Sequence, residues 1–330
     1  MTPLEEIKSK LGVEQLVAEY VTLKQSGTNF KGLCPFHQEK TPSFMVSPEK
    51  QIWHCFGCNE GGDVISFIEK YEGLDFKGAL EMLAHKTGVT LRGFSVTDQS
   101  KKKVLYDIHE EAAAFYADHL ASASVDAVKT REYLKARGLT DESMKLWGLG
   151  LSPDSWDMLA KHLQEKKFSL GDLTTAGLVI SREQKVFDRF RRRLMFPIRD
   201  GQSRTVAFTA RTLQYIVHED ADQAGKYVNS PQTPIYNKSQ ILYGFDQAKH
   251  DIKRLEYAII VEGNMDVIMS HQAGVKNAVA VSGTALTLEQ LKLLKRYTSN
   301  CVLSFDADTA GSQAVFRGIT LAWDYDMNVK

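Results

Sequence analysis

Two short pairs of metal-binding side chains form the clearest chemical pattern in the sequence. Cys34-Pro-Phe-His37 and Cys55-Phe-Gly-Cys58 each leave two residues between the ligands, and seventeen residues separate the pairs. A gap of two residues lets a tight turn aim both side chains at one ion, so two such turns supply four ligands. The pattern predicts a closed Cys3His site for one structural Zn²⁺, with Gly57 in the tight turn before Cys58.

Neighbouring residues leave other readings of this region open. His54 adjoins Cys55 and could compete as a ligand, but it breaks the two-residue gap. Cys301 lies in an apolar stretch, where an ordinary buried thiol is expected. Aromatic residues around the ligands suit either a small core or single-stranded nucleic acid, and we favour the core for most of them. Lys31 and Lys40 are predicted contacts for DNA.

Acidic residues follow two apolar stretches near the end of the chain. Glu262 comes directly after residues 257–261, and Asp306 comes directly after residues 301–305, with Asp308 two positions on. If both stretches are neighbouring strands of a parallel sheet, their carboxyl ends meet at one edge. Close carboxylates repel one another unless a cation lies between them, and hard oxygen ligands beside a nucleotide favour Mg²⁺ or Mn²⁺. The sequence therefore predicts a catalytic metal site at this edge.

Less specific readings exist for each of these acids. Asp306 and Asp308 could be turn and cap residues of a following helix. Asp266 lies one helical turn beyond Glu262 and could point to the same edge, or it could be a solvated acid in the first turn of a helix.

A basic segment precedes the acidic residues. Residues 181–215 hold nine lysines or arginines against three acids. If Arg191 and Arg193 lie on one strand, they share a face and could bind the phosphates of a template or a nucleotide. Arg192 is expected to be solvated.

The bulk composition sets few limits. The chain has 330 residues, 43% of them hydrophobic, and equal numbers of basic and acidic residues. Overall charge therefore gives no argument for a nucleic-acid partner, and any basic surface must be local. No stretch suits a signal peptide or a membrane span, so we expect a cytoplasmic protein with free thiols available for a metal.

The elements that must position these residues change character along the chain. Residues 4–20 and 61–87 have helical spacing, and residues 28–58 have the glycines, prolines and aromatics of short strands and turns. Strands are predicted over residues 193–198 and 205–209. From residue 256 onward strands and helices alternate, which predicts a parallel sheet with helical crossovers. We expect four parts, with limits at 1–95 (zinc ribbon), 96–103 (linker), 104–250 and 251–330.

Together these motifs resemble the family of bacterial replicative DNA primases (DnaG-type). The resemblance covers the chain from near residue 10 to its end, and its zinc-ribbon block is highly specific. It rests on Phe30-Lys-Gly-Leu-Cys-Pro-Phe-His37, Glu39-Lys-Thr-Pro-Ser-Phe44, Trp53-His-Cys-Phe-Gly-Cys58, Glu60-Gly-Gly-Asp-Val64, Phe190-Arg-Arg-Arg-Leu-Met-Phe-Pro-Ile198, Lys226-Tyr-Val-Asn-Ser-Pro231, Tyr243-Gly-Phe245, Glu262-Gly-Asn-Met-Asp266 and Asp306-Ala-Asp308.

The resemblance implies a fold, an activity and roles for residues. The fold would be an α+β zinc ribbon followed by a mixed α/β domain, with residues 104–250 as the N-terminal subdomain of the RNA polymerase domain and 251–330 as a partial Toprim subdomain. Glu262, Asp306 and Asp308 would hold the catalytic Mg²⁺, with Asp266 nearby. Residues that match nucleotide- or template-contacting positions are Arg191, Arg193, Arg211, Lys226, Asn229 and Lys238.

The implied activity is template-directed synthesis of short RNA primers, with the zinc module helping to choose the start site. The implied partners are single-stranded DNA, ribonucleoside triphosphates and, through a C-terminal domain that this sequence lacks, the replicative helicase of the primosome. The chain is expected to be a monomer.

The sequence also departs from the family pattern. Asn264 stands where the family usually has tyrosine, and Thr209-Ala210 stands where it usually has two glycines, so that added Cβ atoms could crowd a substrate. The sequence stops at Lys330, before the remainder of the Toprim fold, so we expect a fragment. The alternatives are a single-stranded DNA-binding fragment that is inactive through truncation, and another Toprim enzyme such as a type IA topoisomerase or a nuclease.

Overall fold

A computed structural model describes the fold of most of the chain. The described residues are 2–37, 39–72, 74, 76–89, 91, 96–182, 185–213, 225–281, 285–305, 316 and 318–330, with 96–99 and 182 described by their backbone alone. Contacts divide the chain into two compact units, Met1–Gln99 and Ser100–Lys330. No helix in the described part is both long enough and apolar enough to cross a lipid bilayer.

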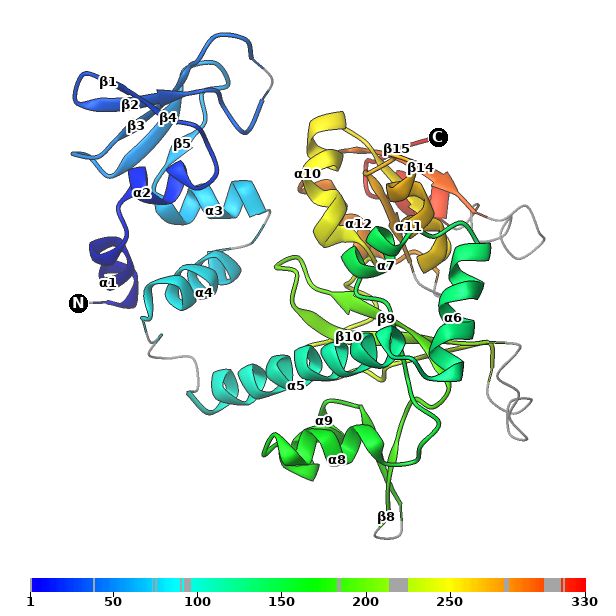
Figure 1. The fold of residues 1–330 in the computed structure, drawn as a ribbon. Coiled ribbons are helices and arrows are strands. Elements are labelled where there is room, and N and C mark those ends of the chain that lie inside the picture. The colour runs from blue at the N-terminus through cyan, green and yellow to red at the C-terminus, as the bar shows by residue number, and fades with distance from the viewer. Residues whose placement is uncertain are drawn as a thin grey trace. The chain divides into compact units, whose positions relative to one another are not determined.

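The first unit combines a small antiparallel sheet with helices before and after it (Figure 1). The predicted helical stretch 4–20 is two helices, because the chain leaves the helical conformation at Leu11 and Gly12. The sheet has the strand order β1-β2-β3-β4-β5. Its elements are α1 (Pro3–Lys10), α2 (Val13–Ala18), β1 (Lys24–Ser26), β2 (Asn29–Gly32), β3 (Phe44–Ser47), β4 (Ile52–Cys55), β5 (Gly61–Gly62), α3 (Val64–Glu72) and α4 (Phe76–Thr87).

One face of this sheet forms the core of the first unit. Phe44 and Val46 of β3 and Trp53 of β4 are buried together with apolar residues of all four helices. The Trp53 ring stacks on Phe44, with centroids 5.3 Å apart, and meets the edge of Phe67 in α3 at 5.9 Å. These rings therefore serve the core, whereas Phe56 is 74% exposed.

Most of the long helix α5 belongs to the second unit, which starts at Ser100. Residues 96–103, which the sequence predicted as a linker, form the first turns of this helix. They contain no glycine or proline, and the buried face that starts at Leu105 and Ile108 allows the helix to extend backwards through them. The helices of this part are α5 (Val96–Ala121), α6 (Val125–Ala136), α7 (Asp141–Leu146), α8 (Met158–Glu165) and α9 (Leu170–Thr175).

A four-stranded sheet of order β11-β10-β9-β6 is the centre of the second unit. Met195 and Phe208 face a core shared with α5, α8 and α9. Phe196 and Ile198 face a second core on the opposite side of the sheet. The strands are β6 (Gly150–Leu151), β9 (Arg193–Arg199), β10 (Thr205–Thr212) and β11 (Tyr227–Asn229), and β7 (Val179–Arg182) and β8 (Lys185–Asp188) form a separate hairpin.

The predicted parallel sheet follows, with the order β13-β12-β14-β15. Helices α10 and α12 share a core with β12, β13 and β14. The fold class expected from the sequence, an α+β unit followed by a mixed α/β unit with a parallel sheet, is confirmed. The elements are α10 (Phe245–Leu255), β12 (Ala258–Val261), α11 (Asn264–Gln272), β13 (Ala278–Ala280), α12 (Leu288–Lys295), β14 (Asn300–Ser304) and β15 (Asn328–Val329), and residues 318–323 are helical.

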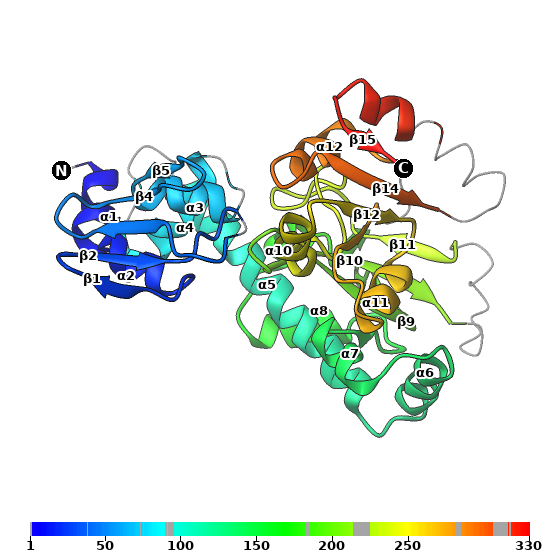
Figure 2. The ribbon, with the colours of Figure 1, turned by 90° about the horizontal axis from the view of Figure 1, so that it is seen from above.

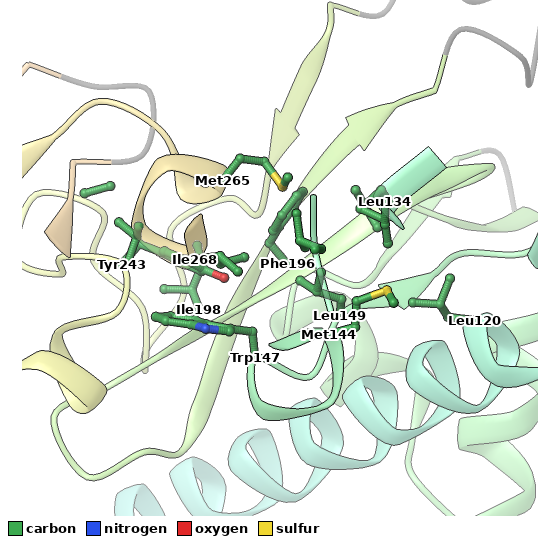
Figure 3. Close-up of a cluster of buried hydrophobic side chains, with 14 of the residues drawn as sticks. Leu120, Leu134, Met144, Trp147, Leu149, Phe196, Ile198, Tyr243, Met265 and Ile268 are labelled. Carbon is green, nitrogen blue, oxygen red and sulfur yellow. The ribbon is translucent and has the colours of Figure 1, made fainter. Parts of the chain in front are cut away.

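Helix α11 joins the two sheets of the second unit. Figure 2 shows α11 beside β9, β10 and β11, and Figure 3 shows Met265 and Ile268 pointing toward Phe196 and Ile198 of β9. All four side chains are at most 6% exposed. This contact fixes the start of α11, and with it the acidic segment, against the antiparallel sheet.

A buried histidine in α5 should make the stability of this core depend on pH. His109 is fully buried, stacks on Phe208 and has Nδ1 2.8 Å from the Leu105 carbonyl oxygen. Burial lowers the pKa of His109 to about 4, so the unfolded chain takes up a proton near its ordinary pKa of 6.5 while the folded chain does not. Stability is therefore full above pH 6.5 and falls as the pH drops toward 4.

We expect the wild-type chain to lose about 3 kcal/mol of unfolding free energy, relative to His109→Leu, between pH 7 and pH 4. Urea unfolding of both proteins at a series of pH values measures this difference. Parallel pH profiles for the two proteins would contradict the expectation.

Candidate functional site

The metal-binding residues of the first unit lie at one end of its sheet. Cys55 is the last residue of β4, and Cys58 lies in the turn that follows. Gly32 of β2 pairs with Phe44 of β3, which pairs with Cys55, so Cys34 two residues after Gly32 arrives beside Cys55. The register of the central strand therefore brings the two ligand turns together.

The four predicted ligands form one cluster whose spacing fits zinc. The potential ligand atoms of Cys34, His37, Cys55 and Cys58 all lie within 4.8 Å of one another. Cys34 Sγ is 3.9 Å from Cys58 Sγ, and Cys55 Sγ is 3.7 Å from His37 Nδ1. A tetrahedral zinc ion would separate two sulfur atoms by about 3.8 Å, and sulfur from nitrogen by about 3.6 Å. The donor set is that of a closed structural site, which leaves no ligand position for a substrate.

Backbone N–H groups in both ligand turns stabilise the thiolate form of the cysteines. The N–H of Phe36 donates to Cys34 Sγ at 3.3 Å, and the N–H of Gly57 donates to Cys55 Sγ at 3.4 Å. Burial nevertheless raises the pKa of Cys34 to about 12, so zinc would have to displace its proton. A Cβ atom on Gly57 would lie 2.6 Å from His37 Nε2, so the role of this glycine is to make room for the histidine ring.

Cys301 and His54, the remaining cysteine and the alternative histidine ligand, are not members of this cluster. The His54 ring packs edge-on against Phe56, with centroids 4.8 Å apart. Cys301 is buried in β14, and burial raises its pKa to about 11, as expected for an ordinary core thiol.

The acidic residues of the second unit lie at the carboxyl edge of the parallel sheet. β12 and β14 are parallel neighbours, and Val261 pairs with Ser304. Glu262 follows Val261 directly and is exposed. Asp306 and Asp308 lie outside the described residues, so their meeting with Glu262 stays a prediction. The strand ends that carry these acids do lie side by side.

Asp266 occupies the first turn of α11 and is exposed to solvent. Its carboxylate accepts a hydrogen bond of 3.0 Å from the N–H of Gly263 and so caps the helix. Asn264, at the start of the same helix, is 4% exposed. Its exposure in the first turn of the helix agrees with the solvated acid that the sequence left open as an alternative, whereas its capping role was not predicted.

Basic and aromatic residues line the β10–β11 ladder. Arg211 of β10 pairs with Tyr227 of β11, and the Arg211 guanidinium lies 5.6 Å from the Tyr227 ring and 6.0 Å from that of Tyr133 in α6. Two residue pairs further along, the Thr209 hydroxyl donates to Asn229 Oδ1 at 2.7 Å. Paired residues point to the same side of a sheet, so Arg211 and Asn229 share a face.

The acidic and basic elements approach each other at Tyr227. Burial raises the pKa of Tyr227, the negative charge of Asp266 raises it further, and the positive charges of Arg211 and Arg137 oppose the shift. An acid of α11 and an arginine of β10 therefore both lie within electrostatic range of one tyrosine. Sequence reasoning did not single out Tyr227, although its position two residues before Asn229 in a strand places both on one face.

Arg191 and Arg193 do not lie on one strand, so the condition under which they would share a face is not met. Arg192 has a left-handed backbone, with φ of 48°, and β9 begins only at Arg193. The Arg191 guanidinium lies 3.3 Å above the Trp156 ring and 3.4 Å from Asp154.

Arg193 lies on the other side of the sheet from Arg211. It pairs with Thr212, whose side chain points away from that of Arg211, and its guanidinium donates to Thr212 Oγ1 at 2.6 Å and to the Gly225 carbonyl at 3.3 Å. Burial lowers the pKa of Arg193.

Lys226 and Lys238, which were predicted to contact nucleotide or template, are less buried than Arg193. Lys226 is exposed beside Tyr227, and its carbonyl accepts from the N–H of Thr212. Lys238 is half-buried near α12, where Gln290 donates to its carbonyl at 3.4 Å, and burial lowers its pKa.

Three parts of the chain match models of known protein families. Residues 1–99 match the CHC2 zinc finger, residues 115–249 match the N-terminal domain of the DNA primase catalytic core, and residues 256–330 match the Toprim domain. The solved structure of the zinc-binding and RNA polymerase domains of Aquifex aeolicus primase is 33% identical, with a TM-score of 0.64, and the match covers 100% of this chain and 78% of that one.

The chain belongs to the DnaG-type primase family. A DNA primase of Halalkalibacterium halodurans is 40% identical over 332 residues, which cover 99% of this chain and 54% of the relative. The DnaG primase catalytic domain bound to single-stranded DNA is 33% identical, with a TM-score of 0.60, and the match covers 69% of this chain and 68% of that one. This chain thus spans about half the length of the curated primases it matches. Its final part is identified as a Toprim domain, and its cysteine–histidine cluster is that of the family's zinc ribbon.

Loss of one thiolate should empty the zinc site. We expect Cys58→Ser to release zinc from the chain and to destabilise the first unit, because serine is a poor zinc ligand and the metal supplies much of the folding energy of such small modules. Zinc content of the purified protein and thermal unfolding of the first unit measure the two effects. Cys301→Ser is the matched control and should keep its zinc; full zinc retention in Cys58→Ser would defeat the assignment.

The hydroxyl of Thr209 should contribute to stability through Asn229. Thr209→Val keeps the shape of the side chain but removes the donor to Asn229 Oδ1, so we expect a loss of about 1 kcal/mol in unfolding free energy. Urea unfolding of Thr209→Val and of the wild-type chain measures this loss. Equal stability of the two proteins would show that the hydrogen bond contributes nothing.

Proposed function

We propose that this chain carries the template-selecting and RNA-polymerising parts of a DNA primase, which joins ribonucleotides on single-stranded DNA. The observation that carries the proposal is the parallel pairing of β12 with β14, which brings the strand end before Glu262 beside the strand end before Asp306. Polymerisation of nucleotides needs an acidic metal site and a cationic phosphate site, and for the second the β10–β11 ladder offers Arg211. The names of relatives that span the whole chain support the same activity.

The acidic edge suits a catalytic cation. Glu262 would hold Mg²⁺ or Mn²⁺ with Asp306 and Asp308, because hard carboxylate oxygens suit these ions and would otherwise repel one another. Bound there, the ion would neutralise triphosphate charge and activate the primer hydroxyl for in-line attack with release of pyrophosphate. Asp266 is committed to capping α11, so we assign it a supporting position beside the ligands.

The basic face would hold the phosphates and the template. Arg211 and Lys226 are the cations nearest to Tyr227 in the β10–β11 ladder, and Asn229 adds an amide on the same face as Arg211. Arg193, which is enclosed by Thr212 and Gly225, would stabilise the ladder from its other side. Arg191 and Lys238 would make outlying contacts, and Lys31 and Lys40 would contact the template from the zinc ribbon.

The partners follow from the proposed reaction. A single-stranded DNA template is supported by the catalytic domain of a related primase, whose structure contains single-stranded DNA. We further propose ribonucleoside triphosphates as substrates, a replicative helicase as a partner, a monomeric state, and a location at the replication fork in the cytoplasm.

Neutralising one acid of the metal site should stop the reaction. We expect Glu262→Gln or Asp306→Asn to abolish primer synthesis, since each removes a charged ligand, while zinc content stays intact. Incorporation of labelled ribonucleotides on single-stranded templates measures the effect, and Glu289→Gln in the first turn of α12 is the exposed control.

Three outcomes would argue against this proposal or favour one of the alternative functions. Undiminished synthesis in either acid variant would refute the metal assignment. DNA binding by the wild-type chain without incorporation, in the presence of Mg²⁺, would favour an inactive binding fragment, and strand cutting without nucleotides would favour another Toprim enzyme.

A further inference from the structure

One carboxylate lies between the two ligand turns of the zinc ribbon. Glu39 Oε1 accepts hydrogen bonds from the backbone N–H of Cys34 at 2.7 Å and of Ser43 at 3.0 Å. Glu39 Oε2 accepts from the Ser43 hydroxyl and lies 3.3 Å from His37 Nε2. The Glu39 side chain is only 10% exposed, so these donors largely replace water around its charge.

The contacts of Glu39 extend to a third ligand through Ser43. Ser43 Oγ lies 3.2 Å from Cys55 Sγ, within hydrogen-bonding range for sulfur. Glu39 and Ser43 together therefore touch the backbone of one ligand, the ring of a second and the sulfur of a third. Both residues belong to the segment Glu39-Lys-Thr-Pro-Ser-Phe44, and neither of them has a part in the proposed polymerase reaction.

The position of Glu39 also settles which nitrogen of His37 can bind metal. Nδ1 faces Cys55 Sγ at 3.7 Å, and Nε2 faces the carboxylate. A carboxylate can only accept, so a hydrogen on Nε2 is stabilised there, and Nδ1 keeps its lone pair for the ion. A histidine ligand held by a carboxylate in this way is better oriented and more basic than a free one.

We propose that Glu39 is a positioning residue of the zinc site, which binds no metal itself but holds His37 with Nδ1 toward the ion and ties the Cys34 and Cys55 turns together. Ser43 takes part in holding the two turns together, because it contacts both Glu39 and Cys55. The inference is independent of the polymerase proposal, because it concerns metal retention alone.

Zinc affinity tests the proposal directly. Glu39→Ala removes all of the contacts, and we expect zinc to bind about 10- to 100-fold more weakly. Glu39→Gln keeps the shape but cannot accept at both oxygen positions, so we expect about a 10-fold loss. Competition of the purified chain with a chromophoric chelator measures each dissociation constant, with Glu49→Gln, an exposed acid of the same unit, as the matched control.

Two outcomes overturn the proposal. The first is zinc affinity in Glu39→Ala and Glu39→Gln equal to that of the Glu49→Gln control. The second needs no variant: ¹⁵N chemical shifts of the His37 ring in the zinc-loaded wild-type chain must show metal on Nδ1 and a hydrogen on Nε2, and the reverse assignment excludes the role of Glu39. Cobalt(II) loaded in place of zinc adds a spectroscopic check, because distorted coordination in Glu39→Gln should change the visible absorption bands while Glu49→Gln leaves them unaltered.

Discussion

The packing of α11 on the antiparallel sheet is the constraint on which the candidate site depends. Met265 and Ile268 are buried against Phe196 and Ile198, so the helix cannot move without opening an apolar core (Figure 3). Asp266 lies between Met265 and Ile268 in the same turn of helix. The packing of these two buried residues therefore holds the exposed Asp266 carboxylate near Tyr227. An attraction between acidic and basic groups near the surface would be too weak to hold this geometry, whereas a close-packed core can.

The two units of the chain differ in what stabilises their folds. The second unit has three apolar cores around its two four-stranded sheets. The first unit has one core, and this core includes two of the metal-binding cysteines, Cys34 and Cys55. In a module of this size a bound metal ion stabilises the fold in addition to the apolar core. Residues that orient the ligands of the metal therefore affect both the stability of the fold and the affinity for the metal.

The sequence was most informative where a signal is local. The spacing of Cys34, His37, Cys55 and Cys58 depends only on two turns, and the alternation of strands and helices after residue 256 depends only on periodicity, so both could be predicted. The helical state of residues 96–103 could not be predicted from their polar composition, because the buried face that stabilises it begins after them at Leu105. The separation of Arg191 from Arg193 depends on the left-handed backbone of Arg192, which carries no mark in the sequence. Asp306 and Asp308 stay predictions from the register of β12 and β14.

The threonine at position 209 determines what its neighbour offers to the outside. Because the Thr209 hydroxyl donates to Asn229 Oδ1, the amide is held in one orientation, with its NH₂ group on the side away from that hydroxyl. An NH₂ group held in this direction donates to carbonyl or phosphoryl oxygens, and the hydrogen bond opposes rotation of the amide that would exchange the donor with the acceptor. The threonine at this place thus gives the neighbouring amide a fixed polarity, which its own side chain alone would not have.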